Sequence, residues 1–463
     1  MKQAFVSAII VIWVSSVIRV CAGERDPFGK SIQIDPFSFA YYKDRSADSI
    51  ASEIEANGFK AVRLIIHCVP GSYQTIAELV NAFHQRGIAV WYETFGNGAY
   101  NLSCFPPGWE EWRMKLKGKD PNQVAPGFVY LCINNPAYRE WKKQQVTSIL
   151  RNVRFDGIEI MEAFFPAVNG PSNENYGCLC ENCVEAFLRM YPEEKAPPDF
   201  NDDSSPYYYV RNKRLYQKWI NFRCASVASF QDFIINSAGG VRDTCPGIKV
   251  GAWGIADNVP DPVNTLREWQ GSDGYLIVKT VRPDVYVLQT DWPDWSNPSL
   301  APNYPLLYKP YVEAIRKVSG VPIILQTDLG SKQNCRRGLS WLNECEAAAK
   351  KAGMAGVTGY EYHLNVDIYK AEPRPASATC EDKTVRIIFN KRLDEKSATD
   401  IRNYSISSGS IHSAKLDGNI VELKVSDKPR EVIIKDLSDD PTRRYFRDFP
   451  RVTMSSPQAI QVK

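Results

Sequence analysis

Residues 155–162 read Phe-Asp-Gly-Ile-Glu-Ile-Met-Glu, a short run in which apolar and acidic side chains alternate. Because successive side chains of a β-strand point to opposite faces, this run predicts a strand whose Ile158 and Ile160 pack against helices while Glu159 points the other way. Before it, Asn135-Pro136 is typical of a helix start, where asparagine caps the first turn and proline fits the first helical position. A helix leading into such a strand indicates a β-α unit of a parallel sheet.

The same alternation of β-rich runs and helical patterns extends from Ser31 to about Asn365. Glycines such as Gly58 and Gly87 follow helical runs and are typical of helix ends. The predicted strands are 31–39, 61–67, 88–94, 155–162, 248–253, 284–290, 321–327 and 356–362. Strands and helices in this order predict a TIM-type (β/α)8 barrel with long loops over residues 23–370. An open doubly wound sheet is the alternative, but no Gly-rich phosphate-binding fingerprint follows the first strand.

The pattern changes after residues 371–376, Ala-Glu-Pro-Arg-Pro-Ala, which read as a linker. Apolar residues then recur at every second position, as in 385–389 and 421–425, and Asp417-Gly418 is a turn signal. Strands without helices predict a small all-β sandwich over residues 371–463. This stretch resembles the Ig-like modules of bacterial exported proteins, which usually brace or space a catalytic domain.

The composition limits the class of partner. The 56 basic and 53 acidic residues nearly cancel and form no dense basic cluster, so neither nucleic acid nor membrane insertion is expected. Aromatic residues make up 12% of the chain. Such rings fill a large core or line a sugar groove, and composition does not separate the two.

The N-terminus predicts export. Lys2 precedes an apolar run over residues 4–18, and Val20-Cys21-Ala22 fits a signal-peptide cleavage site, which gives a signal peptide over 1–22 and a secreted or periplasmic protein. A lipoprotein anchor through Cys21 is the alternative. Cys21 is one of 12 cysteines, so cleavage leaves eleven, an odd number that favours a use other than disulfides for some of them.

Carboxylates gather at the predicted strand ends, where barrels of this kind place their reacting groups. The side chains at those ends are His67, Glu93, Glu162, Trp253, Asp291, Asp328 and Glu361. Each carboxylate taken alone fits a helix cap or an ion pair, but their shared placement predicts an acidic pocket. Converging carboxylates repel, which raises the pKa of some and leaves a neutral acid beside ionised ones. Glycosidic cleavage uses that combination: an acid protonates the leaving oxygen, and a carboxylate attacks the anomeric carbon or activates water.

Other side chains are candidate sugar ligands, each with a structural alternative. Glu159 is equally a pocket carboxylate or an ion-pair partner. The others are Arg63, His67, Trp253, Trp292, Trp295 and His363. An ion pair is the alternative for the arginine, a buried structural role for the histidines and core or rim packing for the tryptophans.

Cys178, Cys180 and Cys183 follow Glu162 in the spacing C-x-C-x-x-C. Three thiolates spaced in this way suit one tetrahedral zinc ion, with a fourth ligand from elsewhere, and Cys104 in the loop after the third strand is the neighbouring candidate. Disulfides are the alternative in an exported protein. Two other candidate disulfides are Cys224 with Cys245 and Cys335 with Cys345.

A glutamate at the end of the fourth strand, followed by C-x-C-x-x-C and preceded by a cysteine in the loop after strand 3, resembles the family-42 β-galactosidases and related clan A barrels. The resemblance implies Glu162 as the acid/base. It also implies a structural zinc held by Cys104, Cys178, Cys180 and Cys183. The chain departs from the family in having Met161-Glu162 instead of Asn-Glu, and Asp328 instead of a glutamate at the end of strand 7. β-Galactosidase activity is therefore not implied.

The leading hypothesis is an exported glycoside hydrolase of the retaining type, with Glu162 as acid/base and Asp328 as the partner carboxylate. Asp291 or Glu361 is the alternative in the second role, and Glu93, Asp291 and Glu361 otherwise bind hydroxyls or adjust pKa values. No organic cofactor is expected. The second hypothesis is a carbohydrate-binding or scaffolding barrel that has lost hydrolysis. A third, a zinc-dependent hydrolase, needs an open metal position that four cysteines would close.

Overall fold

The computed structural model describes residues 25–68, 72–118, 128–166 and 169–463. The predicted signal peptide, residues 1–22 with Cys21, lies outside these described residues. Among the helices formed by the described residues, none combines the length and the apolar character needed to cross a bilayer.

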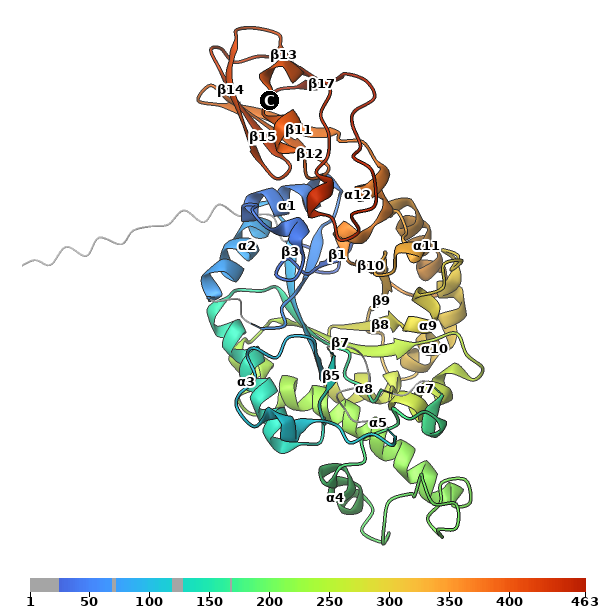
Figure 1. Cartoon of the computed structure of the whole chain (residues 1–463). Coiled ribbons are helices and arrows are strands. Elements are labelled where there is room, and N and C mark those ends of the chain that lie inside the picture. The colour runs from blue at the N-terminus through green and yellow to red at the C-terminus, as the bar shows by residue number, and fades with distance from the viewer. Residues whose placement is uncertain (1–24, 69–71, 119–127, 167–168) are drawn as a thin grey trace, which may run out of the picture.

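Eight parallel strands close into a barrel (Figure 1). In order around the barrel they are β1 (Ser31–Ile34), β2 (Ala61–Ile65), β3 (Ala89–Phe95), β6 (Gly157–Met161), β7 (Lys249–Ala256), β8 (Val285–Thr290), β9 (Ile323–Asp328) and β10 (Gly356–Tyr360). β10 pairs with β1 and completes the ring, which confirms the predicted barrel and excludes the open sheet. The largest difference between predicted and observed strand bounds is at the first strand, predicted over 31–39. It ends at Ile34, because Pro36 has no N–H to donate to a neighbouring strand.

Helices surround the barrel, as Figure 1 shows. The main ones are α1 (Ala47–Ala56), α2 (Tyr73–Gln85), α3 (Pro136–Asn152), α5 (Lys213–Asn236), α7 (Pro262–Gln270), α8 (Gly274–Val281), α10 (Lys309–Arg316) and α11 (Leu339–Lys351). Shorter elements are β4 (Gly98–Ala99), β5 (Val129–Tyr130), α4 (Glu181–Met190), α6 (Val241–Thr244), α9 (Trp292–Trp295) and α12 (Val366–Lys370). Asn135 caps α3 by accepting a hydrogen bond from the Tyr138 amide, as its sequence predicts. Ile158 and Ile160 are fully buried in the core that the strands share with the helices.

The inside of the barrel contains a polar layer between apolar ones. Along β6, the alternate residues Gly157, Glu159 and Met161 share the inner face. Glu159 forms a fully buried ion pair with Arg63, with Nε 3.0 Å from Oε2 and Nη2 3.1 Å from Oε1. At Gly157 a Cβ would lie 2.2 Å from the ring of Trp91, so only glycine fits beside that tryptophan.

Residues after the barrel form two small antiparallel sheets around a second core. One has the order β11 (Pro375–Glu381), β12 (Thr384–Phe389), β15 (Ile420–Val425) and β14 (Ile411–Asp417). The other has the order β13 (Tyr404–Ile406), β16 (Glu431–Ile434) and β17 (Gln458–Gln461), and α13 (Glu395–Ala398) precedes β13. The apolar residues at alternate positions of 385–389 and 421–425 are buried, as predicted.

The C-terminal sheets contact the barrel beside α1 and α12 (Figure 1). Asn419 accepts hydrogen bonds from Arg45 (3.0 Å) and from Ser49 (2.9 Å). Arg392 donates to the carbonyl oxygens of Tyr41 (3.0 Å) and Lys43 (2.7 Å). Because Asn419, Ser49 and Arg392 are largely buried, the two parts form a specific polar interface.

The polar layer generates a stability prediction. Arg63→Met leaves the Glu159 carboxylate buried without its partner, so we expect the free energy of unfolding to fall by about 3–5 kcal/mol. Urea denaturation followed by tryptophan fluorescence measures this change. Lys249→Met is the matched control, since the pair that Lys249 forms with Asp284 is partly exposed and should contribute less than about 1 kcal/mol. Equal losses in the two variants would contradict the role given to the buried pair.

Candidate active site

A cavity of about 520 Å³ opens where the barrel strands end. Of the residues predicted at strand ends, four line it: His67, Glu162, Trp253 and Asp328. Its volume lies in the range of small-molecule sites, roughly 300–1,000 Å³. The two carboxylates proposed from the sequence as a catalytic pair therefore share one cavity.

Glu162 is the first residue after β6, and its backbone has a φ of 53°. This left-handed conformation costs a glutamate of the order of 1–3 kcal/mol and is typical of functional sites. Its Oε1 accepts a hydrogen bond of 2.8 Å from Gln289 on β8. Burial raises the pKa of Glu162, the hydrogen bond from Gln289 opposes this shift and the nearby charge of Asp291 adds to it, so that the pKa is about 7. A carboxyl group with this pKa can hold a proton near neutral pH and release it.

Asp328 is the last residue of β9, two positions after the inward-facing Gln326, so it points into the mouth of the barrel. Its Oδ1 accepts hydrogen bonds from the amides of Gly330 (2.7 Å) and Ser331 (2.8 Å), and Oδ2 accepts one from the Ser331 hydroxyl (2.5 Å). Burial raises the pKa of Asp328, and these donors oppose the shift because they favour the ionised form.

Asp291 and Glu361 do not line the cavity. Asp291 caps α9 through the Trp292 amide (2.8 Å) and accepts a hydrogen bond from Gln270 (2.9 Å), and burial raises its pKa to about 6. Glu361 is fully buried. It accepts hydrogen bonds from the Tyr42 hydroxyl, the Asp35 amide and the His363 amide. Neither carboxylate is therefore placed to contact a ligand in this cavity.

Arg63, Glu93 and Glu159 lie in the barrel below the cavity and do not line it either. Gln33 lies between them and the cavity: it donates to both oxygens of Glu93 (2.9 and 2.8 Å) and accepts from Gln326 (3.0 Å). Burial raises the pKa of Glu93 well above its usual range, and the charge of Glu159 raises it further. The structure thus places Glu159 in the ion pair that was one of its two predicted roles.

The predicted aromatic ligands separate into two groups. Trp253 and Trp295 line the cavity, whereas Trp292 does not and is 52% exposed. The Trp253 indole donates to Glu159 (3.3 Å), which fixes its ring above the polar layer. Trp295 lies on α9, with the Lys332 ammonium 5.5 Å from its ring. Two of the three tryptophans are thus placed to contact a ligand.

Sequence reasoning missed Asp35, which also lines the cavity. Its Oδ2 is 3.0 Å from Nε2 of His67, and its Oδ1 has no hydrogen-bond partner in the part of the chain that the structure describes. The signal was present: Pro36 ends the first strand, which leaves Asp35 at a strand end like the other candidates.

Four cysteines lie close together beside the barrel: Cys132, Cys178, Cys180 and Cys183. Their sulfur atoms all lie within 4.8 Å of one another, and Cys132 Sγ is 3.4 Å from Cys180 Sγ and 3.6 Å from Cys183 Sγ. Four thiolates at about 2.3 Å from one zinc ion would have sulfurs about 3.8 Å apart. The Asn134 amide donates to Cys183 Sγ (3.3 Å), the kind of contact that supports metal-bound thiolates. The donor set and spacing therefore fit a tetrahedral ion.

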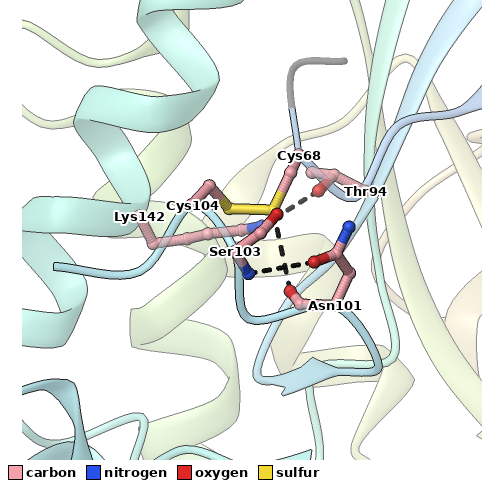
Figure 2. Close-up of a disulfide and its surroundings, with 6 residues drawn as sticks. All are labelled: Cys68, Thr94, Asn101, Ser103, Cys104 and Lys142. Carbon is pink, nitrogen blue, oxygen red and sulfur yellow. Dashed lines mark hydrogen bonds between the residues drawn. A yellow bond between two sulfur atoms is a disulfide. The ribbon is translucent and has the colours of Figure 1, made fainter. Parts of the chain in front are cut away.

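The assignment of Cys104 to this cluster is wrong. Cys104 forms a disulfide with Cys68, which joins the loop after β2 to the loop after β3 (Figure 2). A sulfur in that bond is no thiolate ligand. Figure 2 also shows Lys142 of α3 reaching Thr94 beside the disulfide, with a hydrogen bond of 2.9 Å. Cys132 lies later in the same connection between β3 and α3 and takes the fourth place in the cluster.

The two other candidate disulfides are absent from the described part of the chain. The four cysteines of these pairs, Cys224, Cys245, Cys335 and Cys345, are all free thiols. Cys224 and Cys245 point to different backbone carbonyls, of Arg267 and Leu150. Cys335 donates to the Ser296 carbonyl (3.1 Å). The spacing of these cysteines along the sequence could not show that the members of a pair have different surroundings in the fold.

Comparison with known proteins finds no matching family model and no matching curated protein. Among solved structures, the chain is similar to α-L-fucosidase isoenzyme 2 from Paenibacillus thiaminolyticus, with 13% identity, a TM-score of 0.41, and coverage of 71% of this chain and 45% of that one. It is also similar to endo-glycoceramidase II from Rhodococcus sp., with 12% identity, a TM-score of 0.39, and coverage of 88% and 96%. A third is a β-N-acetylhexosaminidase from Bacteroides fragilis, with 12% identity, a TM-score of 0.38, and coverage of 71% and 60%. These are partial likenesses, and no activity is carried over from them.

Proposed function

We propose that the chain is a glycoside hydrolase. The observation that carries this proposal is the Glu162 carboxyl group, which lines a cavity of ligand size with a pKa raised to about 7 by burial, while a second carboxylate, Asp328, lines the same cavity. An acid that is protonated near neutral pH beside a carboxylate is the pair that glycosidic cleavage needs.

In the proposed reaction, Glu162 donates its proton to the leaving glycosidic oxygen as the bond to the anomeric carbon breaks. Asp328 attacks that carbon and forms a glycosyl-enzyme ester. Glu162, now ionised, takes a proton from water, whose oxygen attacks the anomeric carbon. The ester bond to Asp328 breaks, Asp328 is restored as a carboxylate, and the sugar leaves with retained configuration. Gln289 orients Glu162 by its hydrogen bond, and His67 and Asp35 are placed to bind sugar hydroxyls.

A non-catalytic carbohydrate-binding barrel is the second candidate, and one observation favours it. Both oxygens of Asp328 already accept hydrogen bonds from its own loop, at Gly330 and Ser331. Such an arrangement stabilises a turn, so a structural role alone would account for the presence of this carboxylate. Hydrolysis assays separate the two candidates: a hydrolase cleaves glycosides and loses this activity in the variants below, whereas a binding barrel cleaves none.

We propose that Cys132, Cys178, Cys180 and Cys183 hold a structural zinc ion. Four thiolates would fill a tetrahedral site and would leave no open position for a substrate or water. The site would connect the segment that leads into α3 with the loop between β6 and α4, the loop that begins at Glu162. Its contribution would be to hold that loop in place.

We propose that the C-terminal sheets form an Ig-like sandwich and that the chain is exported. The order of the strands along the sequence places the first, second, fifth and fourth in one sheet and the third, sixth and seventh in the other, the arrangement of constant-type immunoglobulin domains. The disulfide between Cys68 and Cys104 supports a secreted or periplasmic location, because such bonds persist in oxidising compartments.

The first prediction concerns pH. Burial favours the protonated form of Glu162, and only that form donates a proton, so kcat/KM on an aryl glycoside that is cleaved should fall above pH about 7. Glu162→Gln should lower kcat/KM by about 10²–10⁴-fold and remove this alkaline limb. Asp291→Asn removes a charge that raises the pKa of Glu162, so the limb should move to lower pH. An unchanged profile in Glu162→Gln would refute the acid role.

The second prediction assigns the partner carboxylate by chemical rescue. Asp328→Gly should be nearly inactive on 4-nitrophenyl glycosides, and sodium azide should restore release of nitrophenol by giving a glycosyl azide of inverted configuration. NMR of the product determines the configuration. Asp291→Gly is the control, since Asp291 does not line the cavity and azide should have no effect. Rescue of Asp35→Gly instead would transfer the role to Asp35.

The third prediction concerns metal content. Protein purified without chelator should contain about one zinc per chain by elemental analysis, and Cys132→Ser should lose most of it and melt at a lower temperature. Cys104→Ser should keep the zinc, because Cys104 belongs to the disulfide. A zinc-free native protein, or loss of zinc in Cys104→Ser but not in Cys132→Ser, would contradict the proposed ligand set.

A further inference from the structure

Tyr445 belongs to the C-terminal domain but lines the cavity of the barrel. It lies in the segment between β16 and β17, which leaves the small sheets and returns to the barrel. Among the described residues that line this cavity, it is the single one from beyond the barrel. The wall of the candidate active site is therefore built by both parts of the chain.

The segment is held firmly on either side of Tyr445. The Arg336 guanidinium, from the loop after β9, lies 4.6 Å from the ring of Phe446, 3.9 Å from that of Phe449 and 4.4 Å from that of Tyr369. The Phe446 amide also donates to the Tyr369 hydroxyl (3.3 Å). A cation enclosed by three aromatic rings is a favourable arrangement, so the position of Tyr445 is set by its neighbours.

The base of the segment is also fixed within the C-terminal domain. The carboxylate of Asp439 is paired with Arg444, and it lies 2.6 Å from the ammonium of Lys391. All three side chains are almost fully buried. A buried carboxylate with two cationic partners resists rearrangement, because breaking either contact would leave a charge without compensation.

Tyr445 itself is left largely uncovered. It is 57% exposed, it contacts Phe39 edge-on with ring centres 5.6 Å apart, and its hydroxyl has no hydrogen-bond partner among the described residues. Glu162, by contrast, is less exposed and lines the same cavity directly after β6. The Tyr445 ring is thus held in place, more exposed than the proposed catalytic carboxylates, and its hydroxyl is free. Such a ring can stack on a flat ligand face whose edges carry polar groups.

We propose that Tyr445 forms a sugar-binding subsite at the mouth of the cavity, so that the substrate is an oligosaccharide or polysaccharide that extends from the carboxylates to the C-terminal domain. The inference rests on the proposed glycoside hydrolase function and deepens it. One sugar unit occupies the inner cavity beside Glu162 and Asp328. The next unit stacks on the Tyr445 ring, which covers its apolar face while the hydroxyl is free to bind a neighbouring sugar hydroxyl.

The test compares substrates of different length. The probes are 4-nitrophenyl monosaccharides and unsubstituted oligosaccharides of two to six units prepared from cellulose, xylan, mannan, galactan, chitin and starch. In Tyr445→Ala, the ratio of kcat/KM for the best oligosaccharide to that for the matching monosaccharide glycoside should fall about tenfold, equivalent to about 1.4 kcal/mol. Tyr445→Trp should retain the ratio, because stacking needs a flat ring. Calorimetry with the same oligosaccharides should show the same loss of affinity when Tyr445→Ala is added to Glu162→Gln.

Tyr275→Ala is the control, since Tyr275 is a partly exposed tyrosine on α8 that does not line the cavity. A chain that neither cleaves nor binds any of these sugars would contradict the proposed function and the subsite together. Cleavage with an unchanged ratio in Tyr445→Ala would overturn the subsite alone. An equal loss on short and long substrates would also overturn it, because it would show that Tyr445 only shapes the inner cavity.

Discussion

Closure of the parallel sheet is the constraint on which the site depends. All the strands are parallel, so they end at the same rim, and the pairing of β10 with β1 closes that rim into a ring. Residues far apart in sequence, such as Asp35 and Asp328, therefore reach one cavity. Closure also forces side chains into a confined interior. Gly251 fits there because a Cβ would lie 2.5 Å from Glu159, and the carboxylate of Glu159 is compensated by Arg63. Because the interior is filled, ligands are expected to bind in the cavity at the ends of the strands.

The parts of the structure that depend on local patterns could be predicted from the sequence. The strand Gly157–Met161 lies where the alternation of apolar and acidic residues predicted it, and the helix Ala47–Ala56 ends just before Gly58, a glycine typical of a helix end. The position of Glu162 in the cavity also follows from its place directly after an alternating strand. These features need only a few neighbouring residues, whose propensities and spacing the sequence displays directly.

The features that could not be predicted from the sequence depend on contacts between residues far apart along the chain. Cys104 and Cys132 both lie between β3 and α3, and only the fold shows that the first meets Cys68 and the second meets the cluster. The separation of strand-end carboxylates into those that line the cavity and those, such as Glu361, that bind neighbouring residues is likewise a property of side-chain packing. No sequence pattern around Tyr445 indicates that this residue lines a cavity of the barrel, a domain that ends more than 70 residues earlier in the chain.

The segment around Tyr445 means that the two parts of this chain are not interchangeable modules. A chain truncated at the linker would contain every barrel strand. In it, however, Arg336 would lose two of its three aromatic neighbours, and Phe39 would lose its contact with Tyr445. Replacing the C-terminal domain by another of the same topology would have the same effect unless the new domain carried an equivalent segment. Recombination between relatives should therefore preserve the pair, and both parts are expected to have been inherited as one unit.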